Sequence, residues 1–244
     1  IIHLAGFSGV QEFNQNVLKS FNNNVLATRN LVSFGFKKQK TKLIFSSSAA
    51  VYGKVSKEKI NESKTCKPVN YYGLSKLACE NIINNELKYK KNNYAILRYF
   101  NVVGSMIDFK IQKKINSLLD VIAISIRKKK YSININGNNY DTKDGTPERD
   151  FIHIRDLCKI HAETYKYLTK NKKIVLNCGS GLRYSVLEII RAFEKKIKQK
   201  FRISYKITNP YETKTICSNI SLLRKLLKIG IEKKGINDLI EDYL

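Results

Sequence analysis

Apolar strand-like runs alternate with helical patterns along most of this 244-residue chain. The strand patterns cover residues 1–5, 42–45 and 94–99, and the amphipathic patterns between them cover 16–35 and 72–89. Alternation of this length predicts a parallel, doubly wound sheet with helices on both faces. In such a sheet ligands bind outside the carboxyl ends of the strands. Gly6, Ser48 and Asn101 each follow a strand pattern and fall at that edge.

The second half of the chain has a different pattern. Residues 103–149 contain a helix over 115–129, a strand over 132–135 and most of the polar loop "NGNNYDTKDGTPERD". Strands and helices then return over 151–168, 174–181 and 186–198. We therefore predict an α/β fold, a partial doubly wound (Rossmann-type) parallel sheet with a smaller interleaved substrate-binding α/β lobe. The expected division is 1–102 and 103–244, with about 150–178 returning to the main sheet.

The formal net charge of +25 invites a nucleic-acid interpretation. The excess is mostly lysine, scattered with asparagine through every surface segment, and only residues 127–130 form a compact basic block. That block closes a helix, where cations suit the helix dipole. With no RNA-binding aromatic signature and no zinc finger, we predict a solvated basic surface and no specific nucleic-acid partner. No apolar run approaches the ~18–20 residues of a membrane span, so no membrane partner is expected.

The cysteines and histidines are dispersed along the chain. No Cys-x-x-Cys pair occurs, which disfavours a zinc site or a disulfide framework and favours a reducing, cytoplasmic compartment. His153 is expected to be structural, and no set of side chains has metal-ligand spacing, so we predict no metal. The residues concerned are Cys66, Cys79, Cys158, Cys178, Cys217, His3, His153 and His161.

The stretch "VNYYGLSKLACENII" places two tyrosines before a lysine at the start of a helical pattern. Tyr72 and Lys76 are four residues apart and share a helix face, whereas Tyr71 is rotated off it. A fixed ammonium favours the phenolate and is expected to lower a tyrosine pKa that starts near ~10. Such a tyrosine can act as a general acid and base. Tyr-x-x-x-Lys alone also occurs by chance in many helices.

Upstream, the strand over 42–45 leads into Ser46-Ser47-Ser48 at the edge where ligands bind. A serine hydroxyl there could hydrogen-bond the same substrate oxygen that Tyr72 protonates. The alternative is that the serines end the strand and cap the next turn.

Four segments carry a family resemblance: "LIFSSSAAVYG", "YYGLSKLACE", "LRYFNVVG" and "GNNYDTKDGTPERDFIHIRDL". Together they resemble the extended short-chain dehydrogenase/reductases, and within that family the UDP-glucose 4-epimerases, from residue 2 to about residue 190. Related sugar-nucleotide dehydratases carry Thr-Asp-Glu where this chain has Ser48-Ala49-Ala50, which argues against dehydration.

The resemblance implies a role for each matching residue. Ser48, Tyr72 and Lys76 would be the catalytic triad, with Tyr72 as acid and base on the sugar 4-hydroxyl and Lys76 on the nicotinamide ribose. The residues that would bind NAD are Leu4, Ala5, Gly6, Phe7, Asn23, Ser48, Tyr72, Lys76 and Phe100. Those that would bind the UDP-sugar are Ser48, Ala49, Ala50, Tyr72, Asn101, Leu118 and Arg149.

Some of these residues have structural alternatives. Arg149 could pair with Glu148 or Asp150, and Asn23 and Asn101 could hold turns. The activity implied is a reversible, NAD-dependent 4-epimerisation of a UDP-hexose (UDP-glucose and UDP-galactose) through a 4-keto sugar. The resemblance also implies a homodimer for the full-length protein.

The chain departs from the family pattern in several places. The glycine-rich dinucleotide fingerprint is absent, and in the family it precedes the strand with which this chain opens. We therefore expect an N-terminally truncated copy that holds the C-terminal part of the NAD-binding domain and has little activity alone. Ser8 and Ser117 replace a family lysine and asparagine, and the segment that closes on UDP is not recognisable in "TNPYETKTICSNIS".

Two alternatives to a UDP-hexose epimerase remain. One is another UDP-sugar epimerase of the same superfamily, acting on a pentose, an N-acetylhexosamine or a uronate. The other is a degenerate, non-catalytic basic binding protein.

Overall fold

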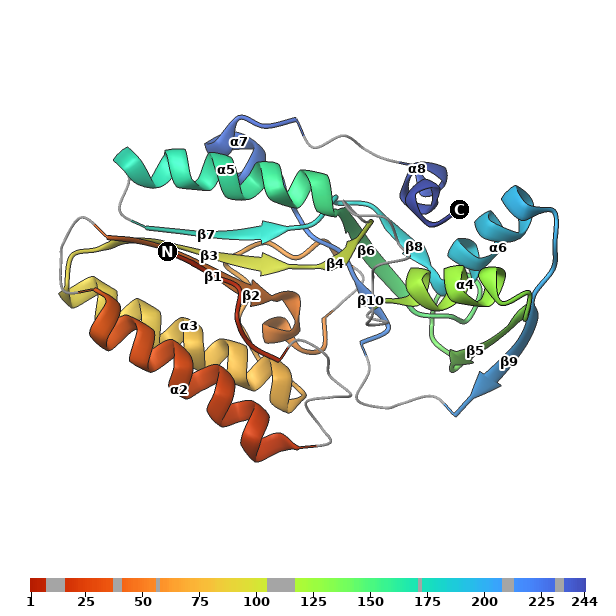
Figure 1. Cartoon of the computed structure of the whole chain (residues 1–244), viewed down its shortest axis with the longest axis horizontal. Helices are drawn as coiled ribbons and strands as arrows, with labels where there is room; N and C mark the ends of the chain where they lie inside the picture. The colour runs from red at the N-terminus through yellow and green to blue at the C-terminus, as the bar shows by residue number, and fades with distance from the viewer. Residues whose placement is uncertain are drawn as a thin grey trace.

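Among the described residues, the main sheet has four parallel strands, in the order β1 (Ile2–His3), β2 (Lys42–Ser48), β3 (Asn93–Tyr99) and β7 (Lys173–Cys178). Helices α2 (Val17–Gly35) and α3 (Tyr71–Tyr89) cover one face, and α5 (Ile154–Lys170) and α7 (Ser221–Leu227) cover the other (Figure 1). The predicted α/β class with a Rossmann-type parallel sheet is confirmed. The computed structural model describes residues 1–7, 16–36, 41–55, 58–104, 117–170, 173–207, 213–230 and 235–244.

The central strand β2 shows why the sheet forms. Leu43 and Phe45 pack into the core beneath α2 and α3, whereas Ile44 packs into the core beneath α5. Because both faces are covered, the strand is apolar at successive positions, as buried parallel strands are. The same alternation continues into the polar end of β2. It directs Ser47 toward α3 and Ser46 toward α5.

A smaller lobe follows β3. In it β6 (Glu148–His153) lies between β4 (Asn101–Val103) and β10 (Thr215–Ile216), parallel to both, and pairs antiparallel with β8 (Arg183–Ser185). Strands β5 (Ser132–Asn136) and β9 (Arg202–Lys206) form a separate parallel pair. A second core lies among these strands and the helices α4 (Leu118–Arg127), α6 (Val186–Ile197) and α8 (Ile236–Ile240).

Side-chain caps fix where the helices begin. Asn16 accepts a hydrogen bond from Lys19 N at the start of α2, and Asn70 accepts one from Gly73 N at the start of α3. Ser117 and Ser185 open α4 and α6 with capping boxes completed by Asp120 and Glu188. Each cap satisfies backbone N–H groups that the first helical turn leaves without partners.

The structure corrects three expected boundaries. The strand expected over 42–45 continues to Ser48, and the helix expected from Tyr72 begins at Tyr71. Glu148–Asp150, expected in a polar loop, form the first half of β6 because their backbone pairs with β8 and β10. Ser8 lies outside the described residues, and the division at residue 102 stays a prediction. No described helix is long and apolar enough to cross a membrane.

Asp150 fixes the turns after β7 and β10 to β6. Its fully buried carboxylate accepts hydrogen bonds from Ser180 N and Oγ at 2.7 and 2.8 Å and from Gly181 N at 3.1 Å. Ser218 N and Oγ donate to it at 2.9 and 2.5 Å. A buried carboxylate is tolerated only when its oxygens are this well satisfied. The segment between β7 and β8 is therefore held to β6 through this side chain.

We predict that Asp150→Ala lowers the free energy of unfolding by about 3–5 kcal/mol, because several buried donors lose their acceptor. Urea denaturation followed by circular dichroism measures the change. The matched control is Asp141→Asn, whose side chain is 70% exposed beside Lys214. That variant should change the free energy by less than about 1 kcal/mol. Equal stability of the two variants would contradict this account of Asp150.

Candidate active site

The first turn of α3 packs directly on the end of β2. Ser48 caps the short 3-10 helix η1 (Ala49–Tyr52) by accepting from Ala50 N at 3.2 Å. Gly73 lies against this turn, where a Cβ atom would sit 2.4 Å from the Ala50 carbonyl oxygen. Only glycine allows that approach, and it brings the N-terminal end of α3 beside Ser48.

This packing buries Tyr72 and leaves Tyr71 in solvent. Tyr72 is 9% exposed and Tyr71 is 54% exposed. The Tyr72 side chain hydrogen-bonds with that of Ser48. The Lys76 ammonium lies 6.0 Å from the centre of the Tyr72 ring and donates to the Ser46 carbonyl oxygen at 2.8 Å. The three residues of the predicted triad are therefore neighbours, and Ser48 both caps a turn and contacts Tyr72.

The pKa of Tyr72 differs from the sequence-based expectation. Burial raises it, and the hydrogen bond from Ser48 acts in the opposite direction. The sequence predicts that Lys76 lowers the pKa of Tyr72, but burial has the larger effect. Burial also lowers the pKa of Lys76, because an ammonium loses water there. Both shifts favour the neutral forms of the pair.

His3, at the end of β1, lies behind Lys76. It is 7% exposed, packs on the Phe45 ring, and has its Nε2 3.0 Å from Thr28 Oγ1. Burial lowers the pKa of His3, and the positive charge of Lys76 lowers it further. The imidazole is therefore neutral at pH 7 and adds no second cation to the site.

On the α5 side, a hydrogen-bond chain leads away from the triad. Tyr99 Oη is 2.7 Å from Ser46 Oγ and 2.7 Å from His161 Nε2. His161 Nδ1 lies 2.9 Å from the Leu157 carbonyl and therefore carries the ring proton in the neutral form. Tyr99 then donates to His161, and Ser46 donates to Tyr99. The chain fixes the rotamer of Ser46, whose carbonyl holds Lys76.

The predicted cofactor residues gather at the ends of β1 and β3. Leu4, Ala5 and Gly6 are exposed, Phe7 is half-buried, and Phe100 is buried. Gly6 has φ +146°, and a Cβ atom there would sit 2.7 Å from Asn24 Oδ1. The backbone conformation at Gly6, where the chain leaves β1, therefore requires glycine.

Asn24 is a site residue that sequence reasoning missed. It receives a hydrogen bond from Phe7 N at 2.8 Å and donates to Phe7 O at 3.1 Å and to Ser75 Oγ at 3.4 Å. It therefore ties the loop after β1 to α3. Its neighbour Asn23, the predicted residue, is exposed on α2. Three consecutive asparagines gave no signal for which one faces inward, because that depends on the packing of α2.

The predicted substrate residues fall into two groups. Ala49 and Ala50 lie in η1 beside Ser48 and Tyr72. Asn101, Leu118 and Arg149 belong to the smaller lobe, on β4, α4 and β6. Asn101 donates to the Asp150 carbonyl at 3.1 Å, and Arg149 donates to the carbonyls of Glu148 and Lys214 at 3.0 and 3.3 Å.

One apolar cluster joins these two groups. Phe100, between β3 and β4, packs with residues of η1 and with Ile216 of β10. Ile216 is the residue that lies opposite Arg149 where β10 pairs with β6. The two groups are thus held by a shared core.

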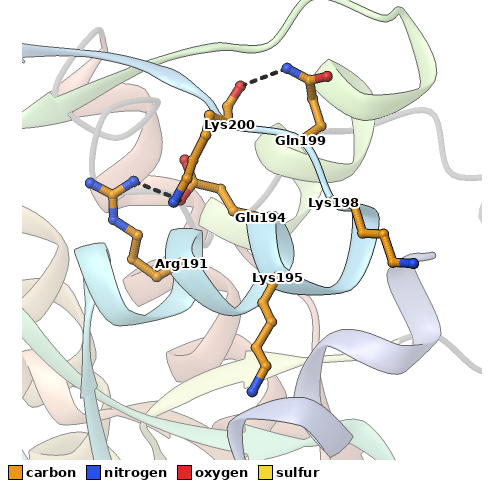
Figure 2. Close-up of a pocket in the computed structure, with 6 residues that line it drawn as sticks. All are labelled: Arg191, Glu194, Lys195, Lys198, Gln199 and Lys200. Atoms are coloured by element: carbon orange, nitrogen blue, oxygen red, sulfur yellow. Dashed lines mark hydrogen bonds and ion pairs between the residues drawn. The ribbon is translucent and has the colours of Figure 1, made fainter.

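A basic hollow of about 400 Å³ lies along α6 and contains none of the predicted site residues. Arg191 turns toward Glu194, whereas Lys195 and Lys198 point away (Figure 2). Glu194 accepts from Arg191 Nη1 at 2.6 Å and from Phe201 N at 2.8 Å, so its contacts link α6 to the start of β9.

His153 is held in place by two hydrogen bonds. Its Nδ1 accepts from Arg155 N at 3.1 Å, so Nε2 carries the proton and donates to Asp242 at 2.7 Å. No cluster of three or more potential metal ligands occurs in the part of the chain that the structure describes.

Comparison with known proteins places these features in context. Residues 1–179 match the NAD dependent epimerase/dehydratase family. The UDP-glucose 4-epimerase of Mycoplasma genitalium is 33% identical over 251 residues, covering 99% of this chain and 73% of that protein.

Solved structures of UDP-glucose 4-epimerases also resemble this chain. A UDP-glucose-4-epimerase from Stenotrophomonas maltophila, with bound NAD and formylated UDP-arabinopyranose, superposes with TM-score 0.91 at 27% identity, covering 99% of this chain and 74% of that one. The UDP-glucose 4-epimerase of Bifidobacterium longum, in complex with NAD⁺ and UDP, gives TM-score 0.89 at 32% identity, with coverage of 99% and 74%.

We predict that Lys76→Met raises the pKa of His3, because a nearby positive charge is lost. The chain has three histidines, so an NMR titration of the imidazole resonances resolves them. Lys90→Met is the control, since that lysine caps the C-terminal end of α3 and donates to Val32 O and Ser33 O. An unchanged His3 midpoint in Lys76→Met would show that the ammonium does not act at this position.

Proposed function

The chain belongs to the NAD dependent epimerase/dehydratase family, and from that premise we propose that it is a UDP-sugar 4-epimerase that interconverts UDP-glucose and UDP-galactose. The observation that carries the proposal is the contact of Tyr72 with Ser48 beside Lys76 at the carboxyl edge of the sheet. Relatives that are themselves UDP-glucose 4-epimerases match nearly the whole chain.

The described residues fit a nicotinamide dinucleotide at this edge. The exposed backbone over residues 4–6 opens to solvent beside Phe7, and Gly6 provides a turn that side chains would obstruct. Lys76 has an ammonium that can hydrogen-bond a ribose hydroxyl. Phe7, Asn23, Phe100 and the triad would complete this site. When bound, NAD supplies the two-electron oxidation and reduction at C4 of the sugar.

The protein side of the reaction is proton transfer at the sugar 4-oxygen. Tyr72, as the phenolate, takes the proton of the 4-hydroxyl, and as the phenol it returns the proton when the 4-keto sugar is reduced on its other face. Ser48 hydrogen-bonds the same oxygen and keeps it against Tyr72. Because burial raises the pKa of Tyr72, the reaction needs a positive charge that favours the phenolate. Lys76, as an ammonium, is the group placed to supply that charge.

The smaller lobe would hold the nucleotide. A guanidinium suits a diphosphate because it offers positive charge and a planar fork of donors, so we assign Arg149 to the UDP phosphates. Asn101 and Leu118 would contact the remaining UDP. The nucleotide then anchors the substrate while the hexose turns over between the two reductions.

We further propose that two copies associate through α2 and α3. Large apolar side chains are exposed on both helices, at Leu18, Leu26 and Phe34 of α2 and at Leu74 and Tyr89 of α3. Figure 1 shows these helices together as an outer layer. Large apolar side chains exposed on two neighbouring helices are a feature of protein interfaces. The free thiols of all five cysteines support a reducing compartment and hence a cytoplasmic location.

We predict that the double variant Leu26→Glu and Leu74→Glu is monomeric, because buried carboxylates would have no partners in the interface. Sedimentation velocity measures the mass against the 28.1 kDa chain. Ile207→Glu is the control, since that residue is 96% exposed but lies outside α2 and α3. A dimer that survives the double substitution would refute the interface.

We predict that Tyr72→Phe lowers the rate of UDP-galactose conversion by about 100-fold to 10,000-fold, the range for a lost general acid and base. Tyr71→Phe should keep the wild-type rate. The rate and the NAD released on denaturation are measured on each purified protein. NAD content should be equal in the variants.

A panel of UDP-pentose, UDP-N-acetylhexosamine and UDP-uronate separates the related epimerases. If the protein releases no nicotinamide nucleotide and converts none of these sugars, the enzyme proposal fails. Salt-dependent binding of nucleic acid without affinity for UDP would then favour a basic binding protein.

A further inference from the structure

Glu80 is a buried carboxylate on the same face of α3 as Tyr72 and Lys76. The three residues follow one another at intervals of four and form one row along the helix. Glu80 is 2% exposed, and Lys76 is 7% exposed. No role in the proposed chemistry requires Glu80 to touch substrate. A buried charge nevertheless needs a reason, because removing it from water is costly.

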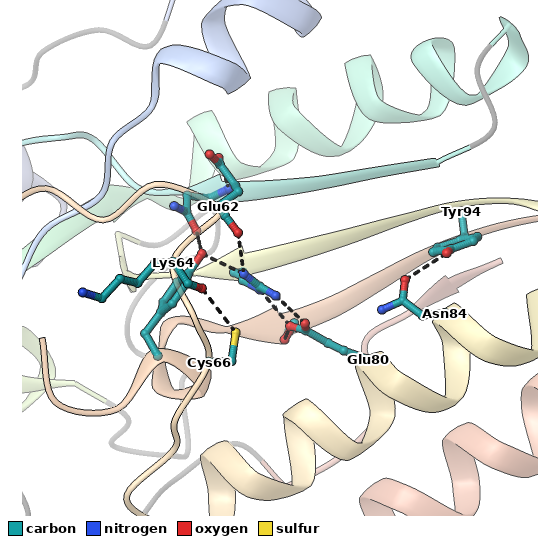
Figure 3. Close-up of polar contacts among 10 residues, drawn as sticks. Glu62, Lys64, Cys66, Glu80, Asn84 and Tyr94 are labelled. Atoms are coloured by element: carbon teal, nitrogen blue, oxygen red, sulfur yellow. Dashed lines mark hydrogen bonds and ion pairs between the residues drawn. The ribbon is translucent and has the colours of Figure 1, made fainter. Parts of the chain in front are cut away.

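Two elements of the sheet hold this carboxylate in place. Arg98 of β3 binds it through two hydrogen bonds, Nε to Oε1 at 3.0 Å and Nη2 to Oε2 at 2.7 Å. Ser47 of β2 donates to Oε1 at 2.5 Å. Figure 3 shows Glu80 extending from its helix toward these strands. A bidentate pair of this kind fixes orientation as well as distance. It therefore fixes α3 against the ends of β2 and β3.

The contacts of Arg98 extend beyond the ion pair. Its Nη1 donates to Tyr52 Oη at 2.9 Å, and Tyr52 donates to Asn177 Oδ1 of β7 at 2.7 Å. Tyr52 ends η1, the turn that Ser48 caps. Ser47 stands between Ser46, whose carbonyl receives Lys76, and Ser48, which contacts Tyr72. Every element that presents a triad residue is thus tied to Glu80.

The charge of Glu80 also acts on Lys76. Burial lowers the pKa of Lys76, while Cys79 and Glu80 act in the opposite direction. Burial raises the pKa of Cys79, so its thiol is uncharged at pH 7 and offers no anion. His3, from β1, has a lowered pKa and is neutral at that pH. Of the groups that face Lys76, namely His3, Tyr72, Cys79 and Glu80, the last supplies the negative charge.

Buried ion pairs seldom add net stability, because desolvation offsets the attraction. A gain in folding stability therefore does not explain why Glu80 and Arg98 are buried together. We propose that Glu80 is a positioning residue for the triad: held by Arg98 and Ser47, it places a negative charge one helical turn from the buried Lys76 ammonium and fixes α3 so that Tyr72 meets Ser48. The catalytic meaning of this arrangement rests on the proposed epimerase function, whereas the charge coupling is a property of the chain itself.

The direct test is an NMR titration of Lys76 in protein labelled with ¹³Cε-lysine. Exposed lysines titrate together near about 10.4, so a buried lysine with a lowered pKa moves apart from them. Lys76→Arg assigns the resonance. We expect Glu80→Gln to shift the Lys76 midpoint downward by about one unit, the lower end for a close opposite charge that is itself paired. Glu86→Gln, an exposed glutamate on the same helix beside Lys90, should leave it in place.

A second variant guards against misfolding of Glu80→Gln, which leaves the Arg98 charge buried alone. The double variant Glu80→Met and Arg98→Met replaces the pair with apolar side chains, an exchange that proteins often tolerate. Its Lys76 midpoint should also lie below that of the wild type. Midpoints within about 0.3 unit of the wild type in every folded variant would overturn the proposal.

A pH profile of activity then connects the charge coupling to catalysis. With Glu80→Gln, we expect the alkaline limb to move to lower pH, because Lys76 loses its proton earlier, and the maximal rate to fall about 10-fold to 100-fold through misplacement of the triad. A purely structural role would lower the rate without moving the limb. Because the lysine titration needs neither cofactor nor substrate, failure of this inference is distinguishable from failure of the epimerase proposal.

Discussion

The packing of α3 on the carboxyl end of β2 is the contact on which the rest of the site depends. It brings a phenol, an ammonium and a carboxylate, at positions 72, 76 and 80, into one buried row. None of these groups would be stable there without partners. Ser48, the Ser46 carbonyl, and Arg98 with Ser47 supply them in the same order. The polar end of β2 therefore allows this row to be buried.

A second constraint connects this edge to the smaller lobe. Phe100 leads from β3 into β4 and packs against η1 and Ile216, while Asp150 gathers the turns after β7 and β10 onto β6. Asn101 and Arg149, two of the residues proposed to hold the nucleotide, therefore sit on strands fixed to the same core as the triad. This rigidity suits the proposed reaction, in which the nucleotide stays anchored and the hexose turns over between two positions. The proposed anchor, Arg149, precedes Asp150 in β6.

Local patterns in the sequence predicted much of this arrangement. The alternation of strands and helices indicated the parallel sheet, and four-residue spacing selected Tyr72 over Tyr71, since a helix repeats every 3.6 residues. Contacts between distant segments were not predictable. Asn24 faces inward and Asn23 outward because of how α2 packs, and Glu148–Asp150 become strand because β8 and β10 pair with them. The predicted direction of the Tyr72 pKa shift was also wrong, because it left out burial. Burial depends on contacts between distant segments.

We propose that this edge of the sheet oxidises and reduces one carbon of a UDP-sugar while Tyr72 transfers only the proton of the attached oxygen. The test is the conversion of UDP-galactose that carries deuterium at C4. We expect UDP-glucose that retains the deuterium at C4 when the reaction is run in ordinary water. Loss of the label to solvent, or a product epimerised at another carbon, would contradict it.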